Sequence, residues 1–174
     1  PVMNAAAPMM EIRHLHKSFG GLRAVQDVSL QVPAGSLTAL IGPNGAGKTT
    51  LFALMSGFLR PDQGQVIFNG EDITGQEPQR NARRGLTRTF QIVQPFAAQT
   101  VRENIAVGAH LHLASRQDAL ERAAQVASQV GLGPQLDKLA GDLTVAGRKR
   151  LELARALATQ PRLLLLDEVL AGLN

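Results

Sequence analysis

The sequence contains no cysteine, no tryptophan and no tyrosine. Without cysteine, neither a disulfide framework nor a thiolate metal site can form. Six phenylalanines are the whole complement of large aromatic side chains, and they are not combined with a basic stripe of the kind that binds nucleic acid by stacking. No apolar run approaches the roughly 18 residues that a membrane-spanning helix needs. These absences argue against a disulfide-rich secreted protein, a nucleic-acid-binding protein and an integral membrane protein.

The rest of the composition is that of an ordinary folded domain. The chain has 174 residues, of which 44% are hydrophobic and 18% are charged, enough for one sizeable core or a core with a small appended subdomain. The net charge is +4, with small basic clusters at residues 80–88 and 148–150 that we interpret as solvated faces. Residues 1–9 lack the features of a signal peptide and indicate a disordered tail or a cloning remnant. We therefore expect a cytoplasmic protein that reaches a membrane only through a partner.

The first part of the chain has the patterns of strands and one helix. Apolar and polar residues alternate, as in half-buried strands, over residues 11–16, 24–32 and 65–70. Residues 37–41 (LTALI) are a short apolar run between turns, which predicts a buried strand. A helix is expected after Lys48, because apolar residues there recur at helical spacing: Leu51, Leu54, Met55 and Phe58.

From Thr100 to about Gln160 the pattern is mostly helical. One predicted helix, residues 118–130, ends at Gly131 and carries an apolar face made of Leu120, Ala123, Ala127 and Val130. A second ends before Pro161 and carries a face made of Leu151, Ala154, Leu157 and Ala158. Residues 163–167 (LLLLD) follow as a continuous apolar run, which is typical of a central parallel strand buried on both faces.

A glycine-rich loop between the predicted strand 37–41 and the helix after it satisfies the pattern G-x-x-x-x-G-K-[ST]. Glycines let successive backbone N–H groups converge on one point, and the helix that follows adds the positive end of its dipole. Lys48 is expected to reach the β- and γ-phosphates of a nucleotide, and the hydroxyl of Thr49 to ligate Mg²⁺. The predicted phosphate loop consists of Gly42, Pro43, Asn44, Gly45, Ala46, Gly47, Lys48, Thr49 and Thr50.

Two acidic residues and a glutamine complete the candidate site. Asp167 and Glu168 follow the run 163–166, and in a parallel sheet both the acids and the loop would lie at the carboxyl edge, where ligands bind. Asp167 could then hold Mg²⁺ and Glu168 could orient or deprotonate the attacking water. The amide of Gln91 could reach the metal or the water. Taken alone, the acids could equally cap a helix, and Gln91 could be a surface residue.

In this order, the segments GPNGAGKTT, RTFQ, LTVAGRKRLELARAL and LLLLDE resemble the ATPase subunits of ATP-binding-cassette (ABC) transporters. Residues 20–75 are most similar to the ATPases of branched-chain amino-acid importers, although importers of urea or other small solutes have much the same sequence. The resemblance implies an α/β fold of the P-loop NTPase class, with a RecA-like core, an antiparallel β subdomain and an α-helical subdomain. It places the core at residues 10–90 and 161–174 and the helical subdomain, with its signature loop, at 91–160.

The same resemblance assigns roles to individual residues. Phe19 would stack on adenine, Gln91 would be the Q-loop glutamine, and residues 171–174 would match the D-loop. Asp167 would be the Walker B metal ligand and Glu168 the catalytic base. A signature loop, residues 143–147, would meet the γ-phosphate held by a second ATPase subunit, through Thr144, Val145, Ala146 and Gly147. The implied cofactors are ATP and Mg²⁺, and the implied partners are transmembrane permease subunits and a second ATPase subunit, homomeric or heteromeric, with no nucleic acid. The implied location is the inner face of the cell membrane.

The sequence departs from the family pattern in three respects. The signature loop reads LTVAG instead of leucine-serine-glycine-glycine-glutamine. Val169 replaces a proline, and Asn174 stands where aspartate is frequent. The family's switch histidine lies beyond the D-loop, whereas all four histidines here precede Asp167. We therefore expect a fragment that lacks the closing strands and helices. This leaves open a nucleotide-binding module without significant turnover, and a cassette ATPase of a nucleic-acid repair system is a further alternative.

Overall fold

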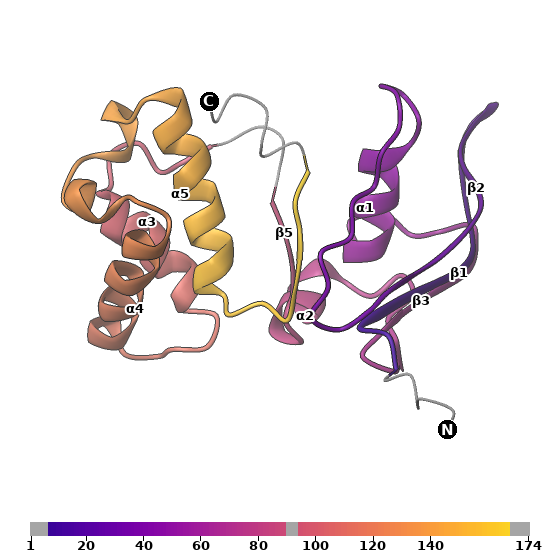
Figure 1. Ribbon diagram of the computed structural model, residues 1–174, viewed down its shortest axis with the longest axis horizontal. Helices are drawn as coiled ribbons and strands as arrows, with labels where there is room; N and C mark the ends of the chain where they lie inside the picture. The colour runs from indigo at the N-terminus through magenta and orange to yellow at the C-terminus, as the bar shows by residue number, and fades with distance from the viewer. Residues whose placement is uncertain (1–6, 90–93, 168–174) are drawn as a thin grey trace. The chain divides into compact units, whose positions relative to one another are not determined.

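A computed structural model describes residues 7–89 and 94–167, and they form two compact units, residues 1–81 and 82–174. The first unit contains an antiparallel sheet and a helix, and the second contains a helical cluster and two short parallel strands (Figure 1). The boundaries expected from the sequence for a core and a helical subdomain stay a prediction. No helix within the described ranges is long and apolar enough to cross a membrane.

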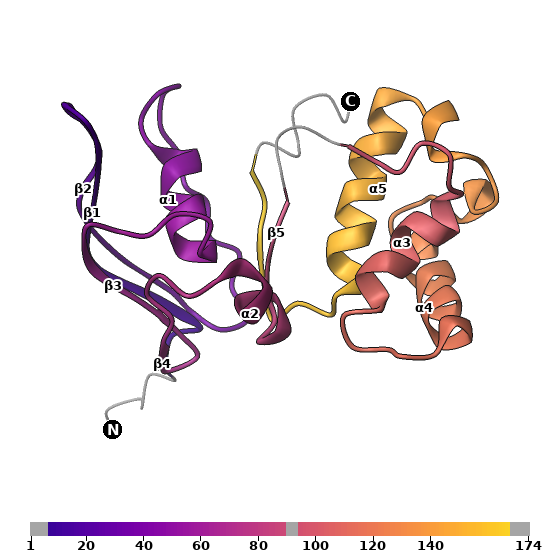
Figure 2. The same ribbon diagram turned by 180° about the vertical axis from the view of Figure 1, so that it is seen from behind.

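The first unit is built on a four-stranded antiparallel sheet in the order β2-β1-β3-β4. The alternating patterns correctly predicted its three longer strands. Figure 2 shows the sheet from behind, with the short β4 at one end. The strands are β1 (Met10–Phe19), β2 (Leu22–Val32), β3 (Gln63–Phe68) and β4 (Glu71–Asp72). Their buried faces include Met10, Ile12, Leu15, Val25, Val66 and Phe68.

Helix α1 (Lys48–Ser56) begins where the phosphate loop ends and contacts β2. Leu51, Leu54 and Met55 are buried as expected. The helix stops at Gly57, which has a φ of 88°, and Phe58 therefore lies outside it with 48% of its surface exposed. A left-handed glycine at this position is a common helix end, so the assignment of Phe58 to the apolar face was wrong.

The strand predicted at residues 37–41 is also absent from the described structure. This run has no strand assignment, and Leu37 and Ile41 are 98% and 90% exposed. An apolar run becomes a strand only where a neighbouring strand receives its backbone hydrogen bonds. None of the described strands pairs with this run, and composition alone could not reveal that.

The second unit has its core among three helices, α3 (Val101–Ala109), α4 (Arg116–Gln129) and α5 (Val145–Ala158). Two short 3₁₀ turns, η1 (Gly133–Gln135) and η2 (Ala140–Asp142), connect α4 to α5. The helical block expected from Thr100 onward is confirmed. In α4 the fully buried residues are Ala119, Ala123, Val126 and Ala127, whereas the expected Leu120 and Val130 pack at the margin of the core. Because α4 packs against both α3 and α5, the side chains that it buries fully are small ones.

The helix interface is close because small residues line it. A Cβ atom on Gly108 of α3 would overlap the carbonyl oxygen of Arg155 on α5. Helix α3 begins with a capping box in which the Thr100 hydroxyl accepts from the Glu103 N–H at 3.1 Å and the Glu103 carboxylate accepts from the Thr100 N–H at 2.9 Å. These bonds satisfy two backbone donors that a helix start leaves without partners.

Strands β5 (Leu86–Arg88) and β6 (Leu163–Leu165) pair in parallel, with Arg88 opposite Leu165. Helix α2 (Pro78–Arg83) leads into β5. The parallel strand expected at residues 163–167 is thus confirmed in direction, but burial on both faces was wrong. Leu163 and Leu164 are half-buried and Leu166 is 39% exposed. Among the described strands β6 has β5 as its only partner, and a strand with one such neighbour does not reach the burial of a central strand.

Candidate functional site

The predicted phosphate loop lies on the surface of the first unit, at the start of α1. Residues 42–46 are exposed, and Lys48 is the first helical residue. The Lys48 ammonium donates hydrogen bonds to the carbonyl oxygens of Gly42, at 2.7 Å, and Pro43, at 2.8 Å. The lysine side chain therefore folds back over the loop that precedes it. A cation in this place can meet an anion that the loop surrounds.

Two glycines of the loop have the left-handed backbone that a side chain disfavours, Gly45 with a φ of 81° and Gly47 with a φ of 85°. Gly47 is also the N-cap of α1, and because glycine has no side chain, it makes no side-chain capping hydrogen bond to this end of the helix. A Cβ atom on Gly47 would overlap the carbonyl oxygen of Ala24 on β2. Backbone donors at the positive end of a helix without a side-chain cap are suited to an anion such as a phosphate.

Phe19 lies in the same unit, at the end of β1, with 46% of its surface exposed. The Lys17 ammonium is 5.6 Å from the centre of its ring and 2.8 Å from a carboxylate oxygen of Asp62. The other oxygen of Asp62 accepts from the Ser18 N–H at 2.7 Å. The Lys17 hydrogen bond, followed by that of Ser18, lowers the pKa of Asp62 below its ordinary value. Asp62 thus fixes the end of the strand that carries Phe19.

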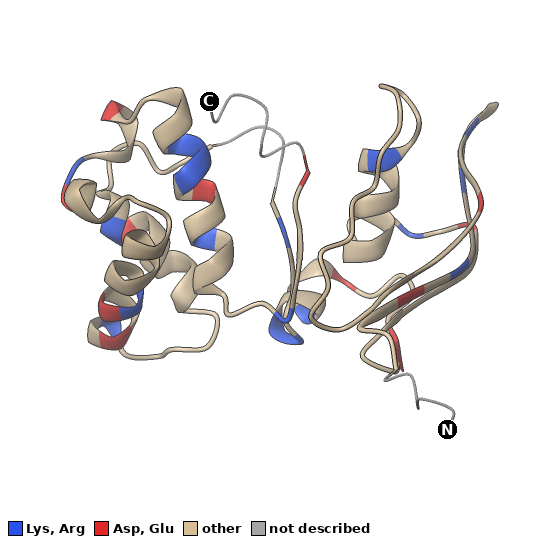
Figure 3. Ribbon diagram, viewed as in Figure 1, with Lys and Arg blue, Asp and Glu red and all other residues tan. Residues whose placement is uncertain are grey.

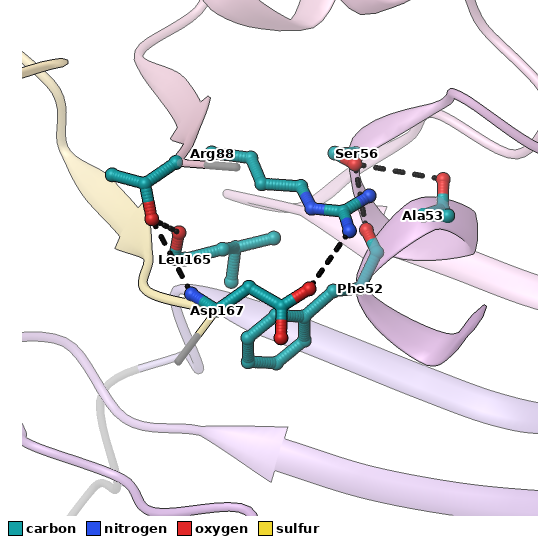
Figure 4. A network of polar contacts seen from close by, with 7 residues as sticks. Phe52, Ala53, Ser56, Arg88, Leu165 and Asp167 are labelled. Carbon is teal, nitrogen blue, oxygen red and sulfur yellow. Dashed lines mark hydrogen bonds and ion pairs between the residues drawn. The ribbon is translucent and has the colours of Figure 1, made fainter. Parts of the chain in front are cut away.

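Asp167 lies in the second unit, two residues after β6, and its side chain is 6% exposed. Arg88, at the end of β5, donates from Nη2 to the Asp167 Oδ2 at 3.0 Å and is itself 7% exposed (Figure 4). Thr89 fastens the two chain segments: its N–H donates to the Leu165 carbonyl at 3.0 Å, and its hydroxyl accepts from the Asp167 N–H at 3.3 Å. The carboxylate is therefore held at the carboxyl edge of a parallel strand pair.

The signature-loop position also lies in the second unit, at the start of α5. Thr144 is the N-cap, and its hydroxyl accepts from the Gly147 N–H at 3.1 Å. Val145 is 73% exposed, whereas Gly147 is buried, and a Cβ atom there would press on Leu143. Arg148, Lys149 and Arg150 follow in the next turn, and Figure 3 shows basic residues gathered at this end of α5. The start of α5 therefore combines the Thr144 hydroxyl, the backbone N–H groups of the first turn and three basic side chains.

Gln91, Glu168 and the segment 171–174 lie outside the described residues. The chain immediately after residue 93 is firmly held: Arg155 donates to the Gln94 carbonyl at 3.3 Å, and its guanidinium is 5.1 Å from the centre of the Phe96 ring. Burial lowers the pKa of Arg155. Asn104, fully buried on α3, accepts from the Phe96 N–H at 2.9 Å and donates to the Phe96 carbonyl at 3.1 Å.

Sequence reasoning missed three of these residues, namely Arg88, Asn104 and Arg155. Arg88 was seen only as part of a basic cluster, yet it is a buried partner of Asp167. The available signal was its position: Arg88 ends the extended segment and does not lie in a polar helix, and this position would have indicated a buried arginine. Asn104 and Arg155 gave none, because their partners are backbone carbonyls and one ring.

The residues present fit a nucleotide and a metal ion. In the first unit the loop supplies glycines, a lysine and a helix start that suit phosphates, and the Thr49 hydroxyl is an oxygen donor of the kind Mg²⁺ prefers. In the second unit the Asp167 carboxylate is a donor of the same kind. Within residues 7–89 and 94–167, no group of three or more histidine, aspartate or glutamate side chains could hold a metal ion.

The chain is similar to known proteins over most of its length. A family described as ABC transporter matches residues 25–171. The protein named high-affinity branched-chain amino acid transport ATP-binding protein BraF, from Pseudomonas aeruginosa, is 40% identical over 96% of this chain and 71% of its own length. LivG of Escherichia coli, which has the same descriptive name, is 38% identical over the same shares.

Solved structures agree with these similarities. MJ1267, described as an ATP-binding cassette of an ABC transporter, superposes with a TM-score of 0.86 at 34% identity, covering 97% of this chain and 72% of its own. The same protein in its ADP conformation gives a TM-score of 0.85. MJ0796, in a dimeric post-hydrolysis state with ADP and phosphate, gives 0.85 at 20% identity, and this last likeness speaks for the fold alone.

Proposed function

The chain belongs to the ABC transporter family, and from this premise we propose that it is the ATP-binding subunit of an importer for branched-chain amino acids. Its fold is the α/β P-loop NTPase fold of ATP-binding cassettes, as the sequence predicted. The family and its structural relatives make it an ATPase subunit. The amino-acid substrate is supported by the names of BraF and LivG.

In this proposal residues 42–50 hold the phosphates of ATP. The supporting observation is the geometry of Lys48, whose ammonium lies over the loop on the Gly42 and Pro43 carbonyls and can turn from them to the β- and γ-phosphates. Phe19 offers an exposed ring for stacking on adenine. A bound Mg²⁺ would supply charge neutralisation, and Thr49, Asp167 and Gln91 would hold it.

The remaining roles belong to hydrolysis and assembly. Glu168 would orient or deprotonate the attacking water, and Gln91 would link the nucleotide site to the helical unit. A second ATPase subunit would offer its helix start at Thr144, Val145, Ala146 and Gly147 to the γ-phosphate, by the anion-binding property of helix N-termini. Transmembrane permease subunits would carry the solute, and this chain would bind them at the inner face of the membrane.

Binding is tested most directly by ligand-dependent stability. A nucleotide present at 100 times its dissociation constant should raise the free energy of unfolding by about 2.7 kcal/mol. We expect this for Mg-ATP and a much smaller rise for AMP, which lacks the phosphates that the loop would surround, or for MgCl₂ at equal ionic strength. A stability that is the same with Mg-ATP and with AMP would contradict the proposed site.

The transported solute needs a separate assay. The protein would be expressed in cells that lack their own LivG-type subunit, and uptake of labelled leucine, isoleucine and valine would be measured beside urea uptake. We expect recovery of uptake for the three amino acids only. Recovery of urea uptake instead would keep the ATPase assignment and reject the substrate.

A further inference from the structure

A buried ion pair connects β5 with the segment that follows β6. The Arg88 Nη2 and the Asp167 Oδ2 are 3.0 Å apart, and the side chains are 7% and 6% exposed. Arg88 ends β5 and lies opposite Leu165, the last residue of the parallel strand β6, and Asp167 follows two residues later. Figure 4 shows the guanidinium directed at the carboxylate. The pair is therefore part of the folded strand arrangement and not a surface contact.

The local backbone holds both partners in place. The Thr89 N–H bonds to the Leu165 carbonyl at 3.0 Å, and the Thr89 hydroxyl lies 3.5 Å from the same oxygen and accepts from the Asp167 N–H at 3.3 Å. Thr89 is 1% exposed. These bonds tie Thr89 to Leu165 and to Asp167, so the ends of the two strands bring the two charges together.

A buried ion pair is seldom needed for stability. Removing two charges from water costs several kcal/mol for each ion, and apolar residues of similar size often serve a fold as well. A buried ion pair is expected where one of its two charged groups also has a functional role. Asp167 has such a role in the proposed site, because carboxylate oxygens are preferred ligands of Mg²⁺. Without a metal ion, its buried charge would be costly unless a cation lies beside it.

We propose that Arg88 is the resident counter-charge of Asp167 and that it competes with Mg²⁺ for this carboxylate. This rests on the proposed function, in which Asp167 holds Mg²⁺. Arg88 is then a positioning residue that holds the carboxylate in place without metal and weakens metal binding. The affinity of the site for Mg²⁺ then depends on how much more strongly the Asp167 carboxylate interacts with Mg²⁺ than with the Arg88 guanidinium.

The first test measures Mg²⁺ binding in the presence of ATP. Arg88→Gln removes the charge and retains a polar side chain, Arg88→Lys keeps the charge, and Arg83→Gln removes a charge from an exposed residue of α2 as a matched control. Like charges repel strongly at short distance in a protein, so Arg88→Gln should lower the half-saturating Mg²⁺ concentration by about tenfold. Arg88→Lys and Arg83→Gln should remain within about twofold of the unchanged chain. A weaker or unchanged Mg²⁺ affinity in Arg88→Gln would overturn the proposal.

The second test uses stability without nucleotide. Either Arg88→Gln or Asp167→Asn alone leaves a buried charge without its partner, whereas the double substitution removes both charges. We expect each single variant to lower the melting temperature and the double variant to lose clearly less than the sum of the two, which is the mark of a coupled pair. Losses that simply add would overturn the pairing. A purely structural Arg88 would give this coupling but not the gain in Mg²⁺ affinity.

A third measurement needs no substitution and covers the case in which Arg88→Gln does not fold. The NMR signal of the Arg88 Nε–H group would be followed in the unchanged chain. It should shift on adding Mg-ATP and stay in place with ATP and a chelator. If Mg-ATP binds, as shown by the rise in stability, and the signal does not move, the counter-charge proposal fails while the proposed function stands. If Mg-ATP does not bind at all, both fail.

Discussion

The ammonium of Lys48 donates a hydrogen bond to the carbonyl oxygen of Gly42 at 2.7 Å, so the two ends of the phosphate loop are tied by one side chain. This contact places the Lys48 ammonium over the phosphate loop. The ammonium group therefore already lies where it can meet an anion that the loop binds.

Lys48→Met should abolish the stabilisation by Mg-ATP while changing the stability of the ligand-free chain little. The side chain is only half-buried, and the two hydrogen bonds lost are worth about 1 kcal/mol each or less in water-exposed surroundings. Thermal unfolding with and without Mg-ATP measures both quantities. Lys138→Met, at an exposed position before η2, is the control. Retention of the full ATP effect in Lys48→Met would show that the loop does not bind the phosphates.

Gly47→Ala should be markedly more destabilising than Gly45→Ala. Both glycines have a φ above 80°, but a Cβ atom at Gly45 meets nothing within 4 Å, whereas at Gly47 it overlaps the Ala24 carbonyl. The backbone conformation alone should cost about 1 kcal/mol in each variant. The clash should raise the loss for Gly47→Ala to about 3 kcal/mol. Urea unfolding of both variants checks this, and equal losses would show that the contact with β2 does not exist.

Asn104→Leu should lower the free energy of unfolding by about 2 kcal/mol, because it removes the hydrogen bonds of a buried amide and takes the side-chain acceptor from the part-buried Phe96 N–H. The Asn104 amide donates to the carbonyls of Phe96, Gln99 and Thr100 and accepts from the Phe96 N–H. Gln99→Ala, at an exposed position of the same loop, should cost less than about 0.5 kcal/mol. Amide hydrogen exchange should rise at residues 94–99 in Asn104→Leu and not in Gln99→Ala. Unchanged exchange at these residues would contradict the role of Asn104.

The lowered pKa of Asp62, which binds the end of β1, predicts that the stability contributed by Asp62 depends on pH. Hydrogen bonds from Lys17 and from the Ser18 amide lower its pKa below the ordinary 3.8. A carboxyl group whose pKa is lower in the folded state contributes stability above its unfolded pKa and loses that contribution as pH falls through the folded value. The stability difference between the unchanged chain and Asp62→Asn should therefore be constant above about pH 5 and shrink below pH 3.8. A difference that grows on acidification would reverse the sign of the argument.

The resemblance to ABC transporter ATPases predicted the fold class, and short-range patterns in the sequence predicted the local elements and the phosphate loop. Alternation defines β1 and β2, and the glycine spacing of residues 42–47 defines a loop before a helix. Each of these features is decided by residues that are close in the chain.

Other features depended on partners distant in the chain. The run 37–41 has the composition of a strand but no described strand beside it, and the burial of residues 163–166 is less than their apolar character suggested because β5 is their described neighbour. Similarly, α4 turns its small residues inward because α3 and α5 contact it. Hydrogen-bond and packing partners are supplied by tertiary structure, so periodicity could not settle these points.

By itself, the sequence determined that this chain is an ATP-binding cassette of the ABC transporter family, since the motif GPNGAGKTT and the order of the segments around it are properties of the chain alone. Only the tertiary structure decided that Arg88 lies against Asp167 and that Asn104 and Arg155 hold the segment after residue 93. The physical reason is that a buried charge or amide takes its partner from whichever segment the packing brings to it. The sequence contains those partners, but 79 positions separate Arg88 from Asp167.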